Sequence, residues 1–184
     1  MKKSIFFLAL CSTLLCAESK LISISDGDTM KFNGVKLSFL KTKKIHNAKC
    51  RVIGIDTPEK FESNKLNKFA QKYNLDINEI KKAGELATKY AENLFFTNSD
   101  KSLEVITLKQ DFYLRELCQI TIDRFDYGRK IVEDGFAVVY KKGKYIDDNK
   151  YKQDLLSAQQ IAKDGRRGLW KDYFEIMEAM SNDY

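Results

Sequence analysis

The sequence predicts an α+β fold, mainly a small β-barrel of five strands accompanied by three or more helices. Five short segments of its 184 residues alternate apolar and polar side chains or form brief apolar runs, which is typical of strands. A helix-periodic segment stands between the third and the fourth of these strands, and further helical segments follow the fifth.

The first three strands are expected at residues 21–25, 30–37 and 50–55. The segment "LISIS" (21–25) alternates, and "MKFNGVKL" (30–37) carries Asn33-Gly34 between two alternating arms, a dipeptide that predicts a tight hairpin. The apolar run "CRVIGI" forms the third strand, and the basic, irregular stretch 38–49 before it is predicted to be an extended or looped excursion.

Helical segments come next along the chain. Residues 62–82 are polar and predict an inserted helical arm, and a firmer amphipathic helix is expected to begin at Ala83. After the strands "LEVITL" (103–108) and "LCQITI" (117–122), a short helix is predicted at 128–135. A longer helix follows at 149–165, with Gly165 capping its end. This order of elements is consistent with a small closed barrel of the oligonucleotide-binding type, the OB fold.

The first 17 residues have the composition of a secretory signal peptide. "MKKSIFFLALCSTLLCA" has two lysines, an apolar run and a small residue at Ala17, so we expect a signal peptide at 1–17 and one domain at 18–184. The apolar run is too short to span a bilayer comfortably. Bulky Leu15 before Cys16 argues against lipid attachment. The expected location is therefore periplasmic or secreted.

Charge and cysteines leave alternatives open. Removal of Lys2 and Lys3 lowers the formal net charge from +6 to +4, which fits either a solvated surface or a basic face for a polyanion. Cys50 and Cys118 remain after export. An even pair in an oxidising compartment is a candidate disulfide, and two buried free thiols are the alternative.

Two acidic clusters stand at the ends of predicted strands. The first is "DGDT", residues 26–29, and the second is "RVIGIDTPE", residues 51–59, which places Asp56 and Glu59 around the only proline. Either cluster alone is ordinary for a turn with solvated acids.

Together and in this order, the two clusters resemble the thermonuclease family, whose type member is staphylococcal nuclease. The segments "DFYLR" (111–115), "VEDGFA" (132–137) and "RRGLW" (166–170) extend the resemblance over nearly all of the mature chain. It implies a calcium-dependent phosphodiesterase on a five-stranded OB-fold barrel. Such an enzyme cuts DNA and RNA with little sequence preference and leaves 3′-phosphate ends.

The resemblance also assigns roles to the acids. Asp28 and Asp56 would supply carboxylates, and Thr57 a backbone carbonyl, to Ca²⁺, a hard cation that prefers oxygen ligands. The ion would act as a Lewis acid on the scissile phosphate. Glu59 would be the general base, with positioning of the attacking water as the alternative role.

The resemblance implies two arginines that hold the charge growing on the phosphate, which planar bidentate donors suit better than lysine does, and Arg51 is the first. The family motif Tyr-Gly-Arg occurs at 127–129, but Arg129 lies only six residues before Gly135, which leaves no room for the family's intervening strand. Arg115 lies twenty residues before Gly135 and is followed directly by a strand, so we predict Arg115 as the second arginine. Leu114 replaces the usual glycine there, and leucine tolerates a positive φ poorly.

The substrate contacts and the cysteine pair complete the expectations. Tyr113 and Tyr140 are predicted to flank the nucleotide, with a place at the edge of the core as the alternative. A disulfide between Cys50 and Cys118 would join the third and fifth strands, which lie side by side in such barrels.

The sequence thus predicts an exported, monomeric nuclease with DNA and RNA as substrates. One rival is a non-catalytic nucleic-acid-binding OB-fold module of the envelope, and the other is a calcium-stabilised envelope protein with no nucleic-acid partner. The retained acids and arginines favour the enzyme. The stretches 38–49 and 62–82 depart from the family pattern.

Overall fold

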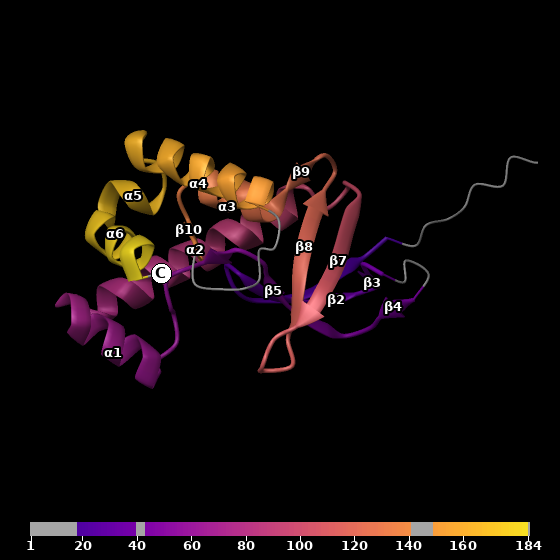
Figure 1. Ribbon diagram of the computed structural model, residues 1–184, viewed down its shortest axis with the longest axis horizontal. Helices are drawn as coiled ribbons and strands as arrows, with labels where there is room; N and C mark the ends of the chain where they lie inside the picture. The colour runs from indigo at the N-terminus through magenta and orange to yellow at the C-terminus, as the bar shows by residue number, and fades with distance from the viewer. Residues whose placement is uncertain (1–17, 40–42, 141–148, 184) are drawn as a thin grey trace, which may run out of the picture.

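The computed structural model describes residues 18–39, 43–140 and 149–183. The expected signal peptide at 1–17 lies outside these ranges. A curled β-sheet occupies one end of the molecule and most of the helices gather at the other, as Figure 1 shows. Within the described ranges, no helix is long and apolar enough to cross a membrane. The predicted α+β class with a barrel-like sheet is confirmed.

The described ranges contain the following strands and helices in chain order. The strands are β1 (Lys20–Asp26), β2 (Thr29–Asn33), β3 (Val35–Leu37), β4 (Lys44–Ile45), β5 (Ala48–Val52), β6 (Ile55–Asp56), β7 (Leu103–Gln110), β8 (Glu116–Ile122), β9 (Phe125–Asp126) and β10 (Val138–Val139). The helices are α1 (Asn64–Tyr73), α2 (Ile77–Thr97), α3 (Tyr127–Glu133), α4 (Asn149–Asp164), α5 (Leu169–Asp172) and α6 (Phe174–Asp183).

The main sheet has the order β1-β2-β5-β8-β7-β3-β4, with β9 paired to β8. The β1–β2, β2–β5 and β7–β8 pairs are antiparallel, whereas β5–β8 and β3–β7 are parallel. β2 and β3 are consecutive in the chain, but β2 pairs with β5 near one end of the strand order and β3 pairs with β7 near the other. The sheet therefore curls on itself. A second, two-stranded sheet joins β6 to β10.

The hairpin predicted at Asn33-Gly34 is wrong. β2 and β3 do not pair with each other, and Gly34, with φ of +75°, bends the chain from one pairing partner to the next. A Cβ at Gly34 would lie 3.2 Å from the carbonyl oxygen of Glu18, a tight contact that adds to the preference of the positive φ for glycine. The tight hairpin is instead the β1–β2 turn, where Asp26 pairs with Thr29.

Several predicted boundaries also differ. The stretch 38–49 is not all loop, because it contains β4 and the start of β5. The helix expected from Ala83 begins at Ile77, where the Asp76 side chain accepts the N–H groups of Asn78 and Glu79 and caps the first turn. Only α1 and the first turns of α2 therefore form the predicted arm.

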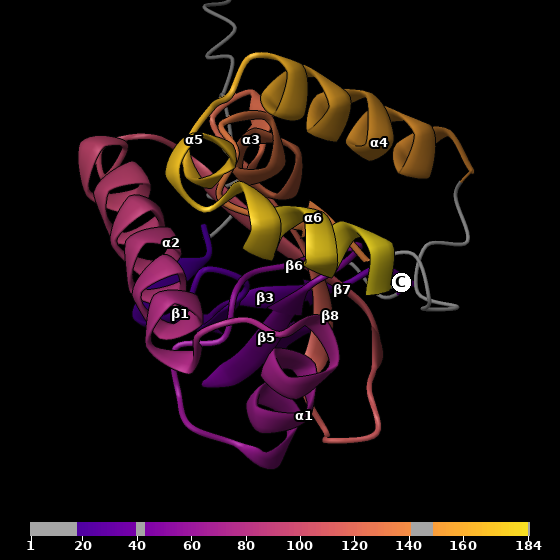
Figure 2. The ribbon, with the colours of Figure 1, turned by 90° about the vertical axis from the view of Figure 1, so that its left-hand side faces the viewer.

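The C-terminal end of the chain adds helices that the sequence reading missed. α5 and α6 were not predicted, and α6 lies between α1 and α4 in both ribbon views (Figures 1 and 2). At the end of α4, the left-handed residue is Arg166, with φ of +47°, and not the predicted Gly165. The N–H of Arg167 donates to the carbonyl of Ala162, which closes this helix end.

Two apolar cores support the fold. One fills the curled sheet and its cover of α3 and α4, with Phe32, Ile120 and Tyr127 fully buried. The other lies between α1, α2, α5 and α6 around Trp170. The Tyr127 hydroxyl donates to the carbonyl of Gly27 at 2.7 Å, so the tyrosine of the "YGR" segment holds the β1–β2 turn.

A disulfide joins Cys50 on β5 to Cys118 on β8, with the Cα atoms 5.6 Å apart. β5 and β8 are parallel neighbours, and both cysteines are buried at the centre of the sheet core. The bond closes a loop of 68 residues that contains β6, α1, α2 and β7.

Reduction of this bond should lower the free energy of unfolding by about 4 kcal/mol, because a loop of this length is strongly restricted in the unfolded chain. Urea unfolding of the protein with and without dithiothreitol measures the difference. A Cys50→Ala/Cys118→Ala variant should be unaffected by the reductant. Equal unfolding curves for the oxidised and reduced protein would contradict the expectation.

Candidate active site

The two acidic turns predicted from the sequence lie against each other. Gly27 in the β1–β2 turn permits the contact, because a Cβ there would lie 2.8 Å from the Thr57 side chain and 3.3 Å from the carbonyl oxygen of Ala87 on α2. The Thr57 N–H and hydroxyl both donate to Oδ2 of Asp28, at 2.9 and 3.0 Å. Asp28 thereby lies beside the chain that follows Asp56.

Arg51 on β5 binds both aspartates at once. One terminal nitrogen of its guanidinium pairs with Asp28, and the other pairs with Asp56 and donates to the carbonyl of Ile55. The exposed fractions of Asp28 and Asp56 are 1% and 4%. Two buried carboxylates therefore share one cation. Burial raises the pKa of nearby Asp26, and the attraction of Arg51 opposes that shift.

Glu59 lies at the edge of the same site. A Cβ on Gly84 of α2 would lie 2.6 Å from the carbonyl oxygen of Pro58 and 2.8 Å from the carbonyl carbon of Glu59, so only glycine lets this segment pass so close to the helix. The Glu59 carboxylate accepts from Nζ of Lys65 at 2.7 Å. Desolvation lowers the pKa of Lys65, but the attraction of Asp56 and Glu59 outweighs it and the net shift is upward.

The β7–β8 connection carries Arg115. Asp111 accepts from the backbone N–H groups of Tyr113 and Arg115, and its other carboxylate oxygen accepts from the Arg115 guanidinium at 2.7 Å. Leu114 adopts φ of +57°, the left-handed conformation that favours glycine. The expected turn thus forms although leucine occupies it.

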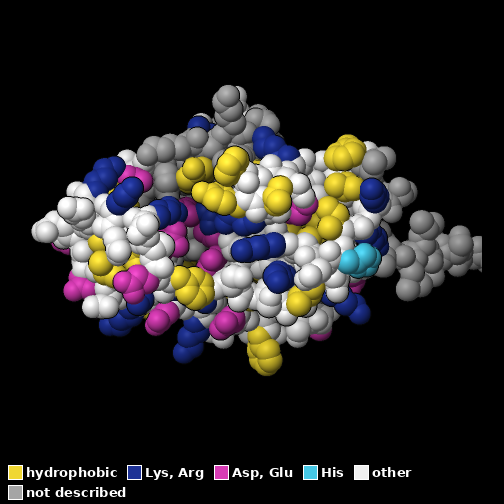
Figure 3. All heavy atoms as spheres, turned by 90° about the horizontal axis from the view of Figure 1, so that it is seen from below, with side chains coloured by type: hydrophobic (Ala, Val, Ile, Leu, Met, Phe, Trp, Pro, Cys, Tyr) yellow, Lys and Arg dark blue, Asp and Glu magenta, His cyan; other side chains and the backbone are white. Residues whose placement is uncertain are grey.

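A cavity of about 420 Å³, here called the arginine cavity, brings most of the predicted residues together. It is lined by Arg51, Asp56, Tyr113, Arg115 and Tyr140. Asp28 does not line this cavity, but it pairs with Arg51, which does. Figure 3 views the molecule from below, where basic and acidic side chains gather near the centre and hydrophobic ones lie around them.

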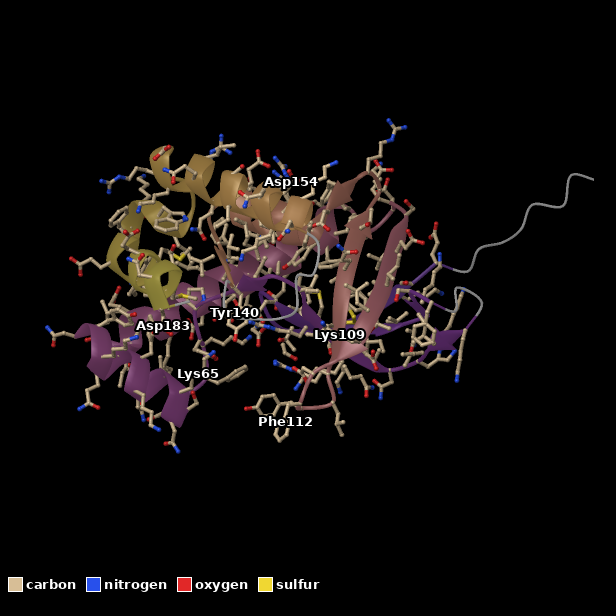
Figure 4. The ribbon with its side chains drawn as sticks, viewed as in Figure 1. Lys65, Lys109, Phe112, Tyr140, Asp154 and Asp183 are labelled. Carbon is tan, nitrogen blue, oxygen red and sulfur yellow. A yellow bond between two sulfur atoms is a disulfide. The ribbon has the colours of Figure 1, made fainter. Side chains whose placement is uncertain are left out.

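Thr57 and Glu59 line a neighbouring cavity instead. This cavity, of about 430 Å³, shares Asp56, Lys65 and Asp183 with the arginine cavity. Figure 4 labels Lys65 and Asp183 on the side of α1 and α6, and Phe112 at the tip of the β7–β8 connection. Arg129 lines neither cavity, since it is exposed on α3 and pairs there with Glu133.

Among the residues that line the arginine cavity, the sequence did not indicate a role for Lys65, Asp111, Phe112 or Asp183. Phe112 has an exposed fraction of 92%, and Tyr113 and Leu114 are 76% and 78% exposed. Three successive large apolar residues at a predicted turn were a signal for this exposed tip. Lys65 and Asp183 carried no local signal, because their places depend on how α1 and α6 pack.

The donor set fits a hard cation with few protein ligands. Among the residues that the structure describes, no group of three or more His, Cys, Asp and Glu side chains is arranged to hold a metal ion. Asp28 and Asp56 nevertheless offer two carboxylates from different strand ends, and oxygen ligands of this kind suit Ca²⁺. Water and substrate oxygens would then have to supply the remaining ligands.

Replacing Leu114 with glycine should relieve the backbone strain at the tip. We expect Leu114→Gly to be more stable than Leu114→Ala by roughly 1 kcal/mol, because alanine keeps the Cβ that opposes a positive φ. Urea unfolding of both variants measures this difference without the effect of the lost leucine side chain. Equal stability of the two variants would show that the turn is unstrained.

Comparison with known proteins identifies the family. A family model described as staphylococcal nuclease homologue matches residues 49–172, which is well over half of the chain. The match includes Arg51, Asp56, Glu59 and Arg115 but begins after Asp28, which the fold brings to Arg51 and Thr57. No curated protein matches the chain. The chain belongs to the family of staphylococcal nuclease homologues.

Proposed function

We propose that the protein is a calcium-dependent phosphodiesterase that hydrolyses DNA and RNA with little sequence preference and leaves 3′-phosphate ends. Membership of the nuclease family supports the general activity. The observation that carries the proposal is the bridge of Arg51 to the buried Asp28 and Asp56, at the wall of a cavity that Arg115 also lines.

The cation would be held by Asp28, Asp56 and the backbone carbonyl of Thr57. When bound, Ca²⁺ would supply Lewis-acid stabilisation of the charge on the scissile phosphate. Arg51 contacts both carboxylates and lines the arginine cavity, so its guanidinium would face a phosphate bound there. When a cation takes over the carboxylates, the planar donors of Arg51 would be released to the phosphate oxygens, which they suit better than a lysine would.

Glu59 is proposed to orient or deprotonate the attacking water. Its side chain has an exposed fraction of 37%, so water reaches the carboxylate. Lys65 donates to the Glu59 carboxylate at 2.7 Å and holds it at the edge of the cavity, where it can accept a proton from a water molecule.

Arg115 is proposed as the second guanidinium on the phosphate. Asp111 Oδ2 accepts from Nε of Arg115 and pairs with its Nη2, whereas Nη1 has no partner among the described residues. Tyr113, Phe112 and Tyr140 line the same cavity and would stack on bases or bond the backbone. Stacking and phosphate contacts accept any base, which accounts for the low sequence preference.

One observation favours a non-catalytic nucleic-acid-binding module as the second candidate. Arg51 and Lys65 already pair with Asp28, Asp56 and Glu59, so these acids are neutralised without a metal ion. In such a module the acids would hold the cations in place for binding alone. It would bind DNA or RNA and never cut it.

We also propose that the protein is exported as a monomer to the periplasm or the medium. The candidate signal peptide supports export, and the Cys50–Cys118 disulfide is typical of oxidising compartments. Mass spectrometry of the protein recovered outside the cytoplasm, together with light scattering, tests cleavage near Ala17 and the oligomeric state.

Glu59→Gln should abolish most of the cleavage and leave binding intact. Loss of a general base lowers kcat by roughly 10²- to 10⁴-fold. Degradation of plasmid and RNA should require calcium and stop with chelator in the wild type. A wild-type protein that binds DNA but fails to cut it with calcium would establish the binding module instead.

Arg115→Ala and Arg129→Ala distinguish the two candidate arginines. We expect Arg115→Ala to lower kcat by about 10²- to 10³-fold, a range typical for loss of one donor to a developing oxyanion. Arg129→Ala, which removes an exposed residue paired with Glu133, should retain near wild-type kcat. The reverse order of the two effects would overturn the choice made from spacing.

A further inference from the structure

The cavity that holds Glu59 extends away from the proposed cleavage site along α1. This α1 cavity is lined by Asp56, Thr57 and Glu59 and also by Lys68 and Phe69 of α1 and Met180 of α6. Its volume of about 430 Å³ lies within the range of small-molecule pockets. α1 belongs to the stretch 62–82 that the resemblance to the thermonuclease family leaves unexplained.

Three lysines of α1 line this cavity. Lys65, Lys68 and Lys72 follow one another at spacings of three and four residues, so they share one side of the helix. Lys65 pairs with Glu59, and Lys72 pairs with Asp183. Lys68 is exposed and has no ion-pair partner among the described residues, so its charge is available to an anion.

The cavity also has an apolar wall. Leu66, Ile80 and Met180 are buried there, and the half-buried ring of Phe69 lies among them. A wall that combines an aromatic ring with a nearby lysine suits a group with a flat apolar face and a negative charge. A nucleotide has both, because its base stacks on aromatic rings and its phosphate attracts lysine.

We propose that the α1 cavity binds a nucleotide of the substrate strand adjacent to the cleaved bond, with Lys68 on a phosphate and Phe69 against a base. This inference rests on the proposed nuclease function. The α1 cavity and the arginine cavity share Asp56, Lys65 and Asp183, so one strand can pass from the β7–β8 tip across Glu59 to α1. The acids on this path are paired with Lys65 and Lys72, which leaves Lys68 to attract the strand.

A single strand fits this path better than a duplex. Phe69 is half-buried between other side chains, and a base reaches its ring only when it is unpaired and turned out of a stack. The α1 cavity therefore extends the site by at least one nucleotide and favours unpaired DNA or RNA over a double helix.

The test compares Lys68→Ala with Lys89→Ala, an exposed lysine on α2 that lines neither cavity. Anisotropy of a labelled oligothymidylate of eight residues is measured on the Glu59→Gln background with calcium, as a function of salt. Loss of one phosphate contact should reduce the slope of log K against log salt by about 0.7 for Lys68→Ala and leave Lys89→Ala unchanged.

The role of Phe69 is tested with Phe69→Leu, which keeps an apolar side chain in the core. Loss of base stacking should weaken binding of the eight-residue strand by roughly fivefold or more, while binding of a dinucleotide changes less. Melting temperatures of all variants verify that they remain folded. Phe69→Ala is omitted because Phe69 also packs in the helical core.

The outcomes separate this inference from the proposed function. If wild-type protein cuts with calcium, but Lys68→Ala and Phe69→Leu bind like Lys89→Ala, the α1 cavity is not a nucleotide site and the nuclease remains. If the wild type never cuts, the nuclease proposal fails. Equal weakening of duplex and single strands by Phe69→Leu would overturn the preference for unpaired bases.

Discussion

The site depends on one buried arginine shared by two buried carboxylates. Asp28 follows β1 and Asp56 ends β6, and neither would be stable as an unpaired charge at exposed fractions of 1% and 4%. Arg51 compensates both and thereby fixes the distance between two strand ends. The proposed cation site and the proposed phosphate contact both depend on this triad of Arg51, Asp28 and Asp56.

The rest of the fold holds the triad in place. Gly27 and Gly84 let the two acidic segments pack against α2, and the hydroxyl of buried Tyr127 donates to the carbonyl of Gly27 in the β1–β2 turn. The Cys50–Cys118 bond joins β5, which carries Arg51, to β8, which begins immediately after Arg115. The arrangement of the charged groups is thus supported by tightly packed backbone rather than by the charges alone.

The sequence was most informative where spacing constrains the chain. The order of strands and the two acidic clusters predicted the barrel-like sheet, and the distance to Gly135 pointed to Arg115, which does line the cavity with Arg51. It failed at Asn33-Gly34, because a dipeptide does not reveal that the next strand pairs with β7, some seventy residues later. It also missed Lys65 and Phe112, since a polar helix and a turn show their importance only once their neighbours are known.

If Arg51 neutralises a pair of carboxylates that a cation can also neutralise, its removal should destabilise the protein and calcium should compensate for it. Thermal and urea unfolding of Arg51→Met are measured with chelator and with calcium. We expect a loss of roughly 3–5 kcal/mol in chelator, because buried Asp28 loses its ion-pair partner and buried Asp56 keeps only Lys65, at 3.9 Å. Calcium should recover much of this loss, since a ligand that binds only the folded state stabilises it. A variant as stable as the wild type in chelator, or a loss that calcium leaves unchanged, would show that Arg51 and a cation do not share this carboxylate pair.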